Sequence, residues 1–432
     1  MKALALSLAK LGDFVQATPL FWGLSQRVDE LGLLCSQKSV AEAANLSGLF
    51  SEVVSIDPTA EGPIKLPFKA QAVYNLSLSP LALNALDKIV SRLPGAAVFG
   101  PRREKGALTL PLAQEVAFAV MRENRRLAPF NLVDVWRRLE PGQVAPAKLH
   151  WPKAAPRPIK GPASHKAPPK NPAVGLILGS GHQRRRWPRE RHRDLAQKLM
   201  ESRSATVYLL GGPGERALGK ALRNGLPPGP GLVDLVGQTD LYGLGRAIEG
   251  LDLLIGSDTG ALHLGAALGV PSVGLYFGPA LARETGPYAP GGLVVQTLAP
   301  CGPCPESRPC PDRACQALPE TETVFLAASH LLGQAPLEGN EAVWSTAVDS
   351  FGYRQSPTSP QADQENVKAV ALREAARAAV DPDYEPQRPM PGPGPREDKF
   401  WRDLADRIWP QANHPSPKRR FLEALGAIGL LG

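Results

Sequence analysis

The chain has 432 residues, of which 43% are hydrophobic and 21% are charged, and its formal net charge is +8. This length suffices for two domains with cores of their own, and the composition is that of an ordinary soluble protein. No apolar run approaches the roughly 20 residues of a transmembrane helix, and the N-terminal sequence lacks a cleavage-site pattern, so we expect a cytoplasmic protein without a signal peptide. The positive charge favours acidic partners, namely nucleotide phosphates, anionic lipid head groups or nucleic acid.

The first 150 residues alternate between apolar runs and helical patterns. Residues 2–8 are mostly apolar, as in a parallel strand that is buried on both faces, and apolar side chains then recur at helical spacing up to Val28. Further strands are predicted at residues 31–35, 53–56, 74–77 and 97–99, and helices at residues 38–46, 83–92, 111–122 and 131–139. Residues 1–150 are therefore predicted to form a doubly wound α/β domain.

Asp13 follows the first predicted strand, in the turn that leads into the first helix. In open α/β folds the carboxyl ends of the strands form the edge that binds ligands. An aspartate in such a turn is also a usual helix N-cap. The residue alone therefore allows both a capping role and a role in a site.

A second domain is predicted after a linker. Residues 151–172 are rich in proline and lysine without an apolar period, which is typical of a semi-rigid connection. Strands are then predicted at residues 173–178, 205–210, 232–236, 251–255 and 272–277, with a helix at residues 261–268. Residues 173–335 are predicted to form this domain, and residues 336–432 a C-terminal extension.

The sequence GSDTGALH places polar residues where a buried strand gives way to a helix. Asp258, Thr259 and Gly260 lie in this turn, so backbone amides and the positive end of the helix dipole are expected to face the space above the sheet. Such a place suits a phosphate group. His263 lies one turn into the helix, where it can donate a hydrogen bond to a bound oxyanion. The alternative is that Asp258 or Thr259 caps the helix and His263 packs in the core.

Two further glycine-rich turns follow predicted strands of the second domain. Gly179 and Gly181 come before an arginine-rich run, which is either a solvated helix face or a cationic wall opposite a phosphate site. Gly211, Gly212 and Gly214 allow close approach of a ligand, and Glu215 could accept hydrogen bonds from ribose hydroxyls.

Four cysteines lie close together in the sequence CGPCPESRPCPDRAC. Cys301, Cys304, Cys310 and Cys315 are separated by two, five and four residues. Four thiolates can bind zinc tetrahedrally in a structural site, but this spacing is not that of two separated C-x-x-C knuckles. Structural zinc, unligated thiols and a disulfide all remain open.

Several of these stretches resemble the ADP-heptose:lipopolysaccharide heptosyltransferases of glycosyltransferase family 9. The run GSDTGALHLGAALGVPSVGLYFGP is similar to the family's D-(S/T)-G-x-x-H pattern with its alanine-rich helix, G-x-P turn and F-G-P end. LGDFVQATPL resembles the family's L-G-D-x-x-x-x-x-P opening, RRWP its (K/R)-x-W-P segment, and LLGGPGE its L-x-G-x-x-x-E turn. The resemblance covers residues 1–330.

The resemblance implies a GT-B fold, in which two Rossmann-like doubly wound domains face a cleft, and an inverting transfer without a catalytic metal. It implies that Asp13 is the catalytic base and that Arg185, at a position where the family carries lysine, stabilises the leaving group. Because arginine cannot serve as a proton donor, any role specific to lysine would be absent here. The implied donor-binding residues are Gly12, Ser180, Arg186, Glu215, Asp258, Thr259, Gly260 and His263.

The substrates follow from the resemblance alone. The implied donor is ADP-heptose, and the implied acceptor is a lipid A-linked core sugar at the cytoplasmic face of the inner membrane, with no nucleic acid expected. Another nucleotide sugar remains an alternative, since one fold hosts many donors. A catalytically silent protein of the same fold and a cysteine-liganded, zinc-containing binding protein, one for nucleic acid included, are the alternatives from other classes.

The C-terminal extension is predicted to be partly disordered. Residues 352–397 are polar and proline-rich, with one helical stretch near residues 362–379. Phe400, Leu404 and Ile408 then share a helix face, and basic residues precede an apolar run at residues 421–431. This pattern allows helices that dock on the body, and equally a basic-aromatic anchor on a membrane surface.

Overall fold

We describe a computed structural model of the chain. It describes residues 1–152, 171–227, 231–297, 299–337, 340, 342–359, 364–384, 386, 398–409 and 415–427. Most of the predicted linker, residues 153–170, lies outside the described residues. Part of the proline-rich stretch, residues 385 and 387–397, also lies outside them.

The first domain is a five-stranded parallel sheet in the order β3-β2-β1-β4-β5. Its strands are β1 (Lys2–Ser7), β2 (Glu30–Cys35), β3 (Glu52–Ser55), β4 (Ala72–Asn75) and β5 (Ala97–Phe99). Alternate residues of β1 face opposite cores: Ala3 and Ala5 pack under α1 (Leu11–Ser25) and α2 (Lys38–Ser47), whereas Leu4 and Leu6 pack under α3 (Pro80–Val90). Burial on both faces explains why β1 is apolar throughout.

A small hairpin and two helices complete the first half of the chain. The hairpin consists of β6 (Arg102–Glu104) and β7 (Ala107–Thr109), and the helices are α4 (Leu112–Glu123) and α5 (Leu132–Trp136). The fifth predicted helix is shorter than expected, because the chain turns at Arg137, whose guanidinium bonds inward to the carbonyl of Ala145 at 2.7 Å.

The second domain contains an eight-stranded sheet in the order β10-β9-β8-β11-β12-β13-β14-β15. From β10 to β13 the strands are parallel, and β14 and β15 add antiparallel to the β13 edge. The strands are β8 (Ala173–Ile177), β9 (Thr206–Leu210), β10 (Leu232–Asp234), β11 (Leu253–Ser257), β12 (Ser272–Tyr276), β13 (Leu293–Gln296), β14 (Val343–Val348) and β15 (Tyr353–Pro357). The helices are α6 (Arg189–Arg203), α7 (Arg216–Asn224), α8 (Leu241–Glu249), α9 (Gly260–Leu268), α10 (Ala282–Thr285) and α11 (Thr321–Leu331).

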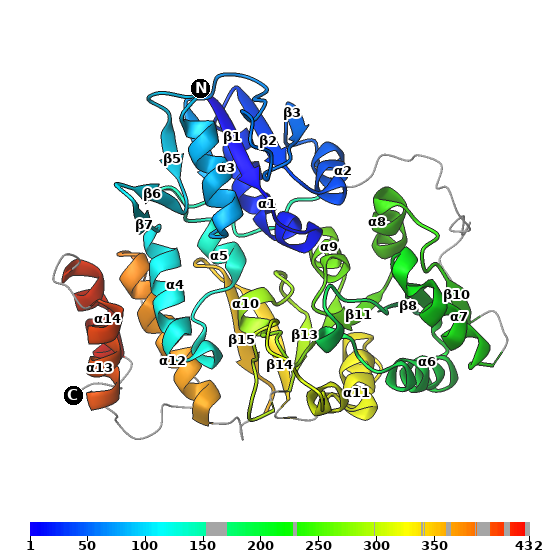
Figure 1. Ribbon diagram of the computed structural model, residues 1–432. Coiled ribbons are helices and arrows are strands. Elements are labelled where there is room, and N and C mark those ends of the chain that lie inside the picture. Colours follow the sequence, from blue (N-terminus) through cyan, green and yellow to red (C-terminus); the bar gives the residue numbers. More distant parts are fainter. Residues whose placement is uncertain are drawn as a thin grey trace.

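The two domains share one hydrophobic core. Side chains of α1 and α2 from the first domain belong to the same buried cluster as Ile248 of α8 and Leu262 of α9. Helix α1 packs against α9, and α2 packs against α8 (Figure 1). The carboxyl edges of the two sheets are therefore held opposite each other.

The C-terminal extension is more ordered than the sequence predicts. Strands β14 and β15 continue the second sheet beyond residue 335, and α12 (Gln364–Val380) is buried against α4 and the turn at residues 125–127. Arg377 of α12 is fully buried and bonds to Asp349 at 2.7 Å. Helix α12 confirms the helical stretch predicted near residues 362–379. The prediction of a domain that ends at residue 335 is wrong, because β14 and β15 continue its sheet, and the prediction of disorder from residue 352 is wrong for the described residues outside α12.

The last two helices dock on the body. Trp401 and Leu404 of α13 (Asp398–Ile408) and Phe421 of α14 (Pro415–Ala427) are buried in one cluster with α12 and α4. The side chains of Phe400 and Ile408 lie outside the described residues. These apolar side chains pack inside the protein and are not available to a membrane surface. The interpretation of these residues as a membrane anchor is therefore wrong. In the described part of the chain, none of the helices has the length and apolarity to cross a membrane.

Candidate active site

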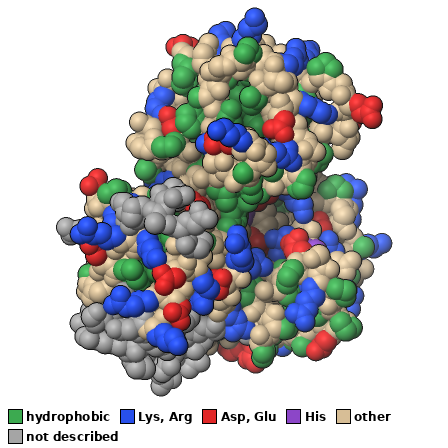
Figure 2. Space-filling view, turned by 60° about the vertical axis from the view of Figure 1, so that its left-hand side comes forward, with side chains coloured by type: hydrophobic (Ala, Val, Ile, Leu, Met, Phe, Trp, Pro, Cys, Tyr) green, Lys and Arg blue, Asp and Glu red, His purple; other side chains and the backbone are tan. Residues whose placement is uncertain are grey.

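The candidate site lies where both sheets reverse their strand order. The reversal falls between β1 and β4 in the first sheet and between β8 and β11 in the second. In doubly wound folds the crevice beyond the strand ends at this point is where ligands bind. Asp13 follows β1, Arg185 follows β8, and Asp258 follows β11. Figure 2 shows a hollow between the upper and lower parts of the molecule, with charged and histidine side chains at its rim.

Two helix N-termini meet at this site through glycines. A Cβ atom on Gly12 would lie 3.3 Å from Cδ2 of His263 and 3.4 Å from Cα of Gly260. A Cβ atom on Gly260 would lie 3.2 Å from the backbone nitrogen of Gly12. Glycine at both positions therefore allows α1 and α9 to approach closely. The first amides of each helix have no partner within the helix, so both ends direct partial positive charge toward the site.

Asp13 is the third residue of α1 and not its N-cap. Lys10 is the N-cap, and its backbone N–H donates to Oδ2 of Asp13 at 3.3 Å, so Asp13 also holds the start of the helix. Burial raises the pKa of Asp13, and the charge of Asp258 raises it further, whereas the hydrogen bond from Lys10 and the charges of His263 and Lys10 oppose the shift. A carboxylate with a raised pKa is better suited to accept a proton than an exposed one.

The carboxylate of Asp258 contacts both Arg185 and His263 at the base of the site. Its Oδ2 accepts from Nη1 of Arg185 at 2.7 Å, and its Oδ1 lies 3.4 Å from Nε2 of His263. Burial alone would raise the pKa of Asp258, but His263 and Arg185 together hold it below the usual value. Asp258 is therefore an anion that fixes its neighbours. The Nδ1 atom of His263 and the Nε atom of Arg185 are buried without a hydrogen-bond partner among the described residues.

The remaining predicted donor residues lie at the rim of the same site. Thr259 is the N-cap residue of α9, but its side chain makes no hydrogen bond to the helix. The alternative that the Thr259 hydroxyl serves as a helix cap is therefore wrong. Ser180 is buried and bonds locally to the backbone of His182. Oε1 of Glu215 lies 3.7 Å from Arg186, which is half exposed, and its Oε2 accepts from the amide of Gly212 at 2.9 Å.

Arg184, the neighbour of Arg185, points away from the site. Its guanidinium is buried and donates to Sγ of Cys304 at 3.2 Å and to the carbonyls of Pro305 and Glu306. Arg185, by contrast, reaches both the site and the cysteine loop, because its Nη1 bonds to Asp258 and its Nη2 lies 3.0 Å from Oε1 of Glu306. Both arginines belong to a short 3-10 turn, residues Gln183–Arg185.

The cysteine loop does not form a closed metal site in this structure. All four cysteines are free thiols, with Cys304 and Cys315 buried and Cys301 exposed. Across the described part of the chain, no three His, Cys, Asp or Glu side chains are grouped to hold a metal ion. Burial, and then the neighbouring thiols, raise the pKa of Cys315. Structural zinc, which the sequence left open beside unligated thiols and a disulfide, stays a prediction.

Lys10 is a site residue that the sequence analysis missed. It is exposed, and its Nζ lies 3.8 Å from the position of a Cβ on Gly181, a position 3.3 Å from Nη2 of Arg185. Two cations from different domains therefore flank the same glycine turn. The sequence did contain a signal for Lys10, because this lysine lies three residues before Asp13 in a strand-to-helix turn.

Two facing doubly wound domains, joined at their switch points, define the GT-B class of fold. A sequence model described as "Glycosyltransferase family 9 (heptosyltransferase)" matches residues 145–311. The resemblance to this family is therefore confirmed over that part of the chain.

Part of the chain is also similar in sequence to individual heptosyltransferases. Lipopolysaccharide heptosyltransferase 1 from Pseudomonas aeruginosa is 30% identical over 138 residues, which are 32% of this chain and 38% of the relative. The matched sequence thus spans well under half the length of that relative.

Solved structures confirm the fold over a longer part of the chain. The glycosyl transferase family 9 protein from Veillonella parvula has a TM-score of 0.55 at 17% identity, covering 77% of this chain and 97% of that one. The structure of E. coli heptosyltransferase WaaC with ADP has a TM-score of 0.52 at 18% identity, covering 78% of this chain and 100% of that one. The predicted GT-B architecture is therefore correct.

Proposed function

We propose that the protein is an inverting glycosyltransferase that moves a heptose from ADP-heptose to a sugar of the lipopolysaccharide core. The observation that carries this proposal is the meeting of Asp13 with the Asp258, His263 and Arg185 group across two helix N-termini. A base on one side and fixed positive charge on the other are what an inverting transfer from a nucleotide diphosphate needs. The family match and the ADP-bound WaaC neighbour support the choice of donor.

In the proposed reaction Asp13 accepts the proton of the acceptor hydroxyl. The acceptor oxygen then forms a bond to the anomeric carbon from the face opposite the diphosphate, and the bond from that carbon to the diphosphate oxygen breaks. The electron pair leaves with ADP, so negative charge grows on the phosphate as the bond breaks. Asp13 comes from the first domain, whereas most of the groups assigned to the phosphate, Arg185 and the first amides of α9, come from the second, with Lys10 of the first domain added to them. This division supports a base and a leaving group on opposite sides of the sugar.

Stabilisation of that growing charge is assigned to Arg185, Lys10 and the first amides of α9. Preorganised donors in a partly buried site act strongly because they need not reorient during the reaction. Asp258 has the wrong sign for phosphate contact, and its role is to orient Arg185 and His263. The buried Nδ1 of His263 has no partner among the described residues, and with Nε2 directed at Asp258 it donates to a ligand oxygen only when the ring carries both protons.

The acceptor is proposed from resemblance and not from a contact in the molecule. A lipid A-linked core sugar would be met at the cytoplasmic face of the inner membrane. A positive formal net charge of +8 favours approach to an anionic lipid surface.

Calorimetric titration with ADP, UDP and GDP tests the donor site. We expect ADP to bind, and we expect Arg185→Met and His263→Ala to weaken ADP binding by about tenfold or more, as loss of a charge-assisted hydrogen bond implies. Arg193→Met, on the exposed face of α6, is the matched control. Preference for UDP or GDP would replace the donor by another nucleotide sugar, and failure to bind any nucleotide would overturn the enzyme proposal.

A further inference from the structure

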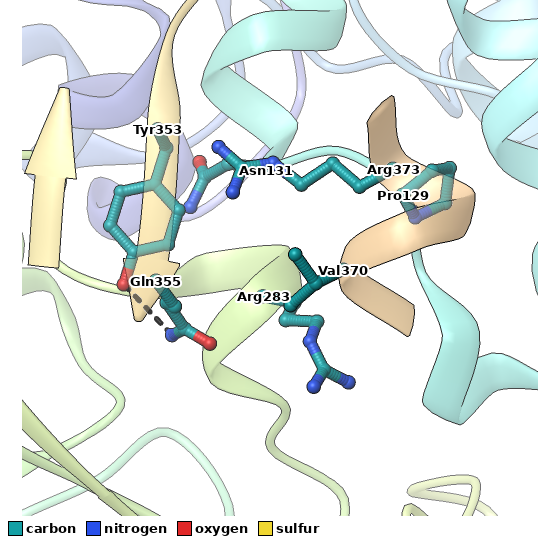
Figure 3. Close-up of a pocket in the computed structure, with 7 residues that line it drawn as sticks. All are labelled: Pro129, Asn131, Arg283, Tyr353, Gln355, Val370 and Arg373. Atoms are coloured by element: carbon teal, nitrogen blue, oxygen red, sulfur yellow. Dashed lines mark hydrogen bonds between the residues drawn. The ribbon is translucent and has the colours of Figure 1, made fainter. Parts of the chain in front are cut away.

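A second polar pocket lies under the C-terminal helix α12, formed by residues that are absent from the candidate active site. It is lined by Pro129 and Asn131 before α5, Arg283 of α10, Tyr353 and Gln355 of β15, and Val370 and Arg373 of α12 (Figure 3). The pocket is small, with enclosed room for about one water molecule, and it opens to solvent at its mouth. Two of the lining residues are arginines and none is acidic.

Arg373 has a buried positive charge without a matching anion. Its side chain is only 7% exposed, and its Nη2 atom has no hydrogen-bond partner among the described residues. Figure 3 shows the side chain running from α12 across the pocket toward Asn131 and Tyr353. An unpaired buried charge is strongly destabilising unless a counter-charge is supplied.

The acidic residues that act on Arg373 are engaged elsewhere. Asp349 bonds to Arg377 at 2.7 Å, and Glu374 accepts from the hydroxyl of Tyr384 at 2.5 Å. The third, Asp134, accepts from Arg137, from the hydroxyl of Tyr288 and from the amide of Tyr353. Burial, and then the charge of Arg377, lower the pKa of Arg373 to about 9, so the guanidinium is still charged at neutral pH. The described protein groups therefore leave a positive charge for an external anion to neutralise.

The other groups around the pocket are suited to an oxyanion. Tyr353 Oη accepts from Nε2 of Gln355 at 3.0 Å, which leaves its own proton as a donor. Nδ2 of Asn131 makes a long bond of 3.3 Å to the carbonyl of Gly286, and its second N–H is a further donor. Arg283 adds a second guanidinium charge at the wall. Guanidinium groups bind phosphate and carboxylate in a bidentate manner.

From this geometry we propose that the pocket binds a small oxyanion, a phosphate or carboxylate group, through Arg373 with Tyr353 and Asn131. The anion joins three parts of the chain: α12, the β15 edge of the second sheet and the segment that precedes α5. Its binding therefore stabilises the attachment of the C-terminal helix to both domains. The proposal is independent of the glycosyltransferase assignment.

The test is the thermal midpoint of the full chain in inorganic phosphate, acetate and glycerol 3-phosphate, each against chloride at equal ionic strength. We expect an oxyanion to raise the midpoint more than chloride does. Glycerol 3-phosphate distinguishes a free phosphate ion from a phosphate group on a larger molecule. A pocket that accepts only the free ion responds to inorganic phosphate and not to glycerol 3-phosphate. An equal response to chloride would overturn the proposal.

Variants separate this pocket from the active site, where phosphate is also expected to bind. In an Arg185→Met background, where phosphate binding at the active site is weakened, the response should persist, and adding Arg373→Met should remove it, while adding Arg419→Gln at the exposed face of α14 serves as the surface control. Without oxyanions Arg373→Met should melt at or above the wild-type temperature, since it removes an unpaired charge. In calorimetry Arg373→Lys, which keeps the charge but loses the planar fork, should weaken phosphate binding by about tenfold. A phosphate response that survives in the Arg185→Met, Arg373→Met double variant, or disappears completely in Arg185→Met alone, contradicts the assignment.

Discussion

At the residue scale, burial under the second domain sets the protonation of Asp13. Desolvation is the largest influence on this carboxyl and raises its pKa, with the nearby charge of Asp258 acting in the same direction. A raised pKa in the folded protein means that the ionised form of Asp13 is less favourable there than in the unfolded chain. The same shift that suits Asp13 to accept a proton therefore reduces stability at neutral pH.

Asp13→Asn is expected to abolish transfer and to stabilise the protein. The proposed loss of the base should reduce kcat by about 100-fold or more, with ADP affinity retained. Wild-type activity should fall on acidification through a pKa above the ordinary 3.8. The stability gain of the variant should be largest above the raised pKa and disappear below the ordinary value, since both forms are then neutral. Thermal melts across pH measure this, with exposed Asp194→Asn as control; a variant that melts lower at pH 8 contradicts the argument.

Lys10→Met should weaken ADP binding by about tenfold or less, as expected for one exposed charge beside a phosphate, and the difference should shrink with added salt. Lys38→Met, an exposed lysine at the start of α2, is the control and should bind ADP as the wild type does. Calorimetry at low and high salt measures both. Equal affinity of Lys10→Met and the wild type at low salt would remove Lys10 from the site.

The sequence predicted the grouping of some site residues but not the direction of their side chains. Asp13, Arg185, Asp258 and His263 follow strand ends, and parallel strands bring such ends to one edge, so their proximity could be foreseen. The different partners of Arg184 and Arg185, of which only Arg185 also bonds to Asp258, depend on a short 3-10 turn and on acceptors in the cysteine loop more than 100 residues later. No local pattern contains that information.

At the scale of elements, the loop between β14 and β15 is joined to the first domain through Asp134. The carboxylate of Asp134 accepts from the amide of Tyr353 at 3.0 Å, from Arg137 at 3.0 Å and from the hydroxyl of Tyr288 at 2.6 Å. Periodicity could not predict this arrangement, because charged residues in α5 and α12 are normally taken for exposed ones. Most of the parallel strands are mainly apolar, and these were predicted to within about two residues at each end, but β13 was not predicted.

Gly352→Ala should disrupt this junction. Gly352 has φ of 149°, and a Cβ there would lie 1.7 Å from Oδ1 of Asp134. The buried carboxylate must move from its partners, so we expect a loss of about 2–4 kcal/mol in the free energy of unfolding. Denaturant titration measures it. Gly62→Ala, where a Cβ would meet nothing within 4 Å, should change stability little. Similar values for both variants would show that the junction is unimportant.

At the scale of the whole molecule, the C-terminal extension covers an apolar surface of the first half of the chain. Val120 of α4 and Leu127 and Phe130 after it are buried in one cluster with α12. The extension is therefore part of the folded body, although the sequence resemblance ends before it. Figure 1 shows α12, α13 and α14 beside α4.

Truncation after residue 337 should expose that surface. We expect the shortened chain to bind a hydrophobic dye and to elute as soluble aggregates in size-exclusion chromatography, because large exposed apolar patches cause association. Truncation after Ala427, which leaves α14 intact, is the control. If the chain truncated after residue 337 is monomeric and does not bind the dye, the extension is not needed to cover the first half of the chain.

The packing of α12 on Phe130 also affects when the protein can fold during its synthesis. Residues 112–136 leave the ribosome well over 200 residues before α12, so their apolar faces must wait without their final partners while the rest of the chain is made. Domains generally fold as units from the N-terminus, but here the first half cannot complete its packing until α12 has been made. Emergence of the first domain from the ribosome is thus not sufficient for its native packing.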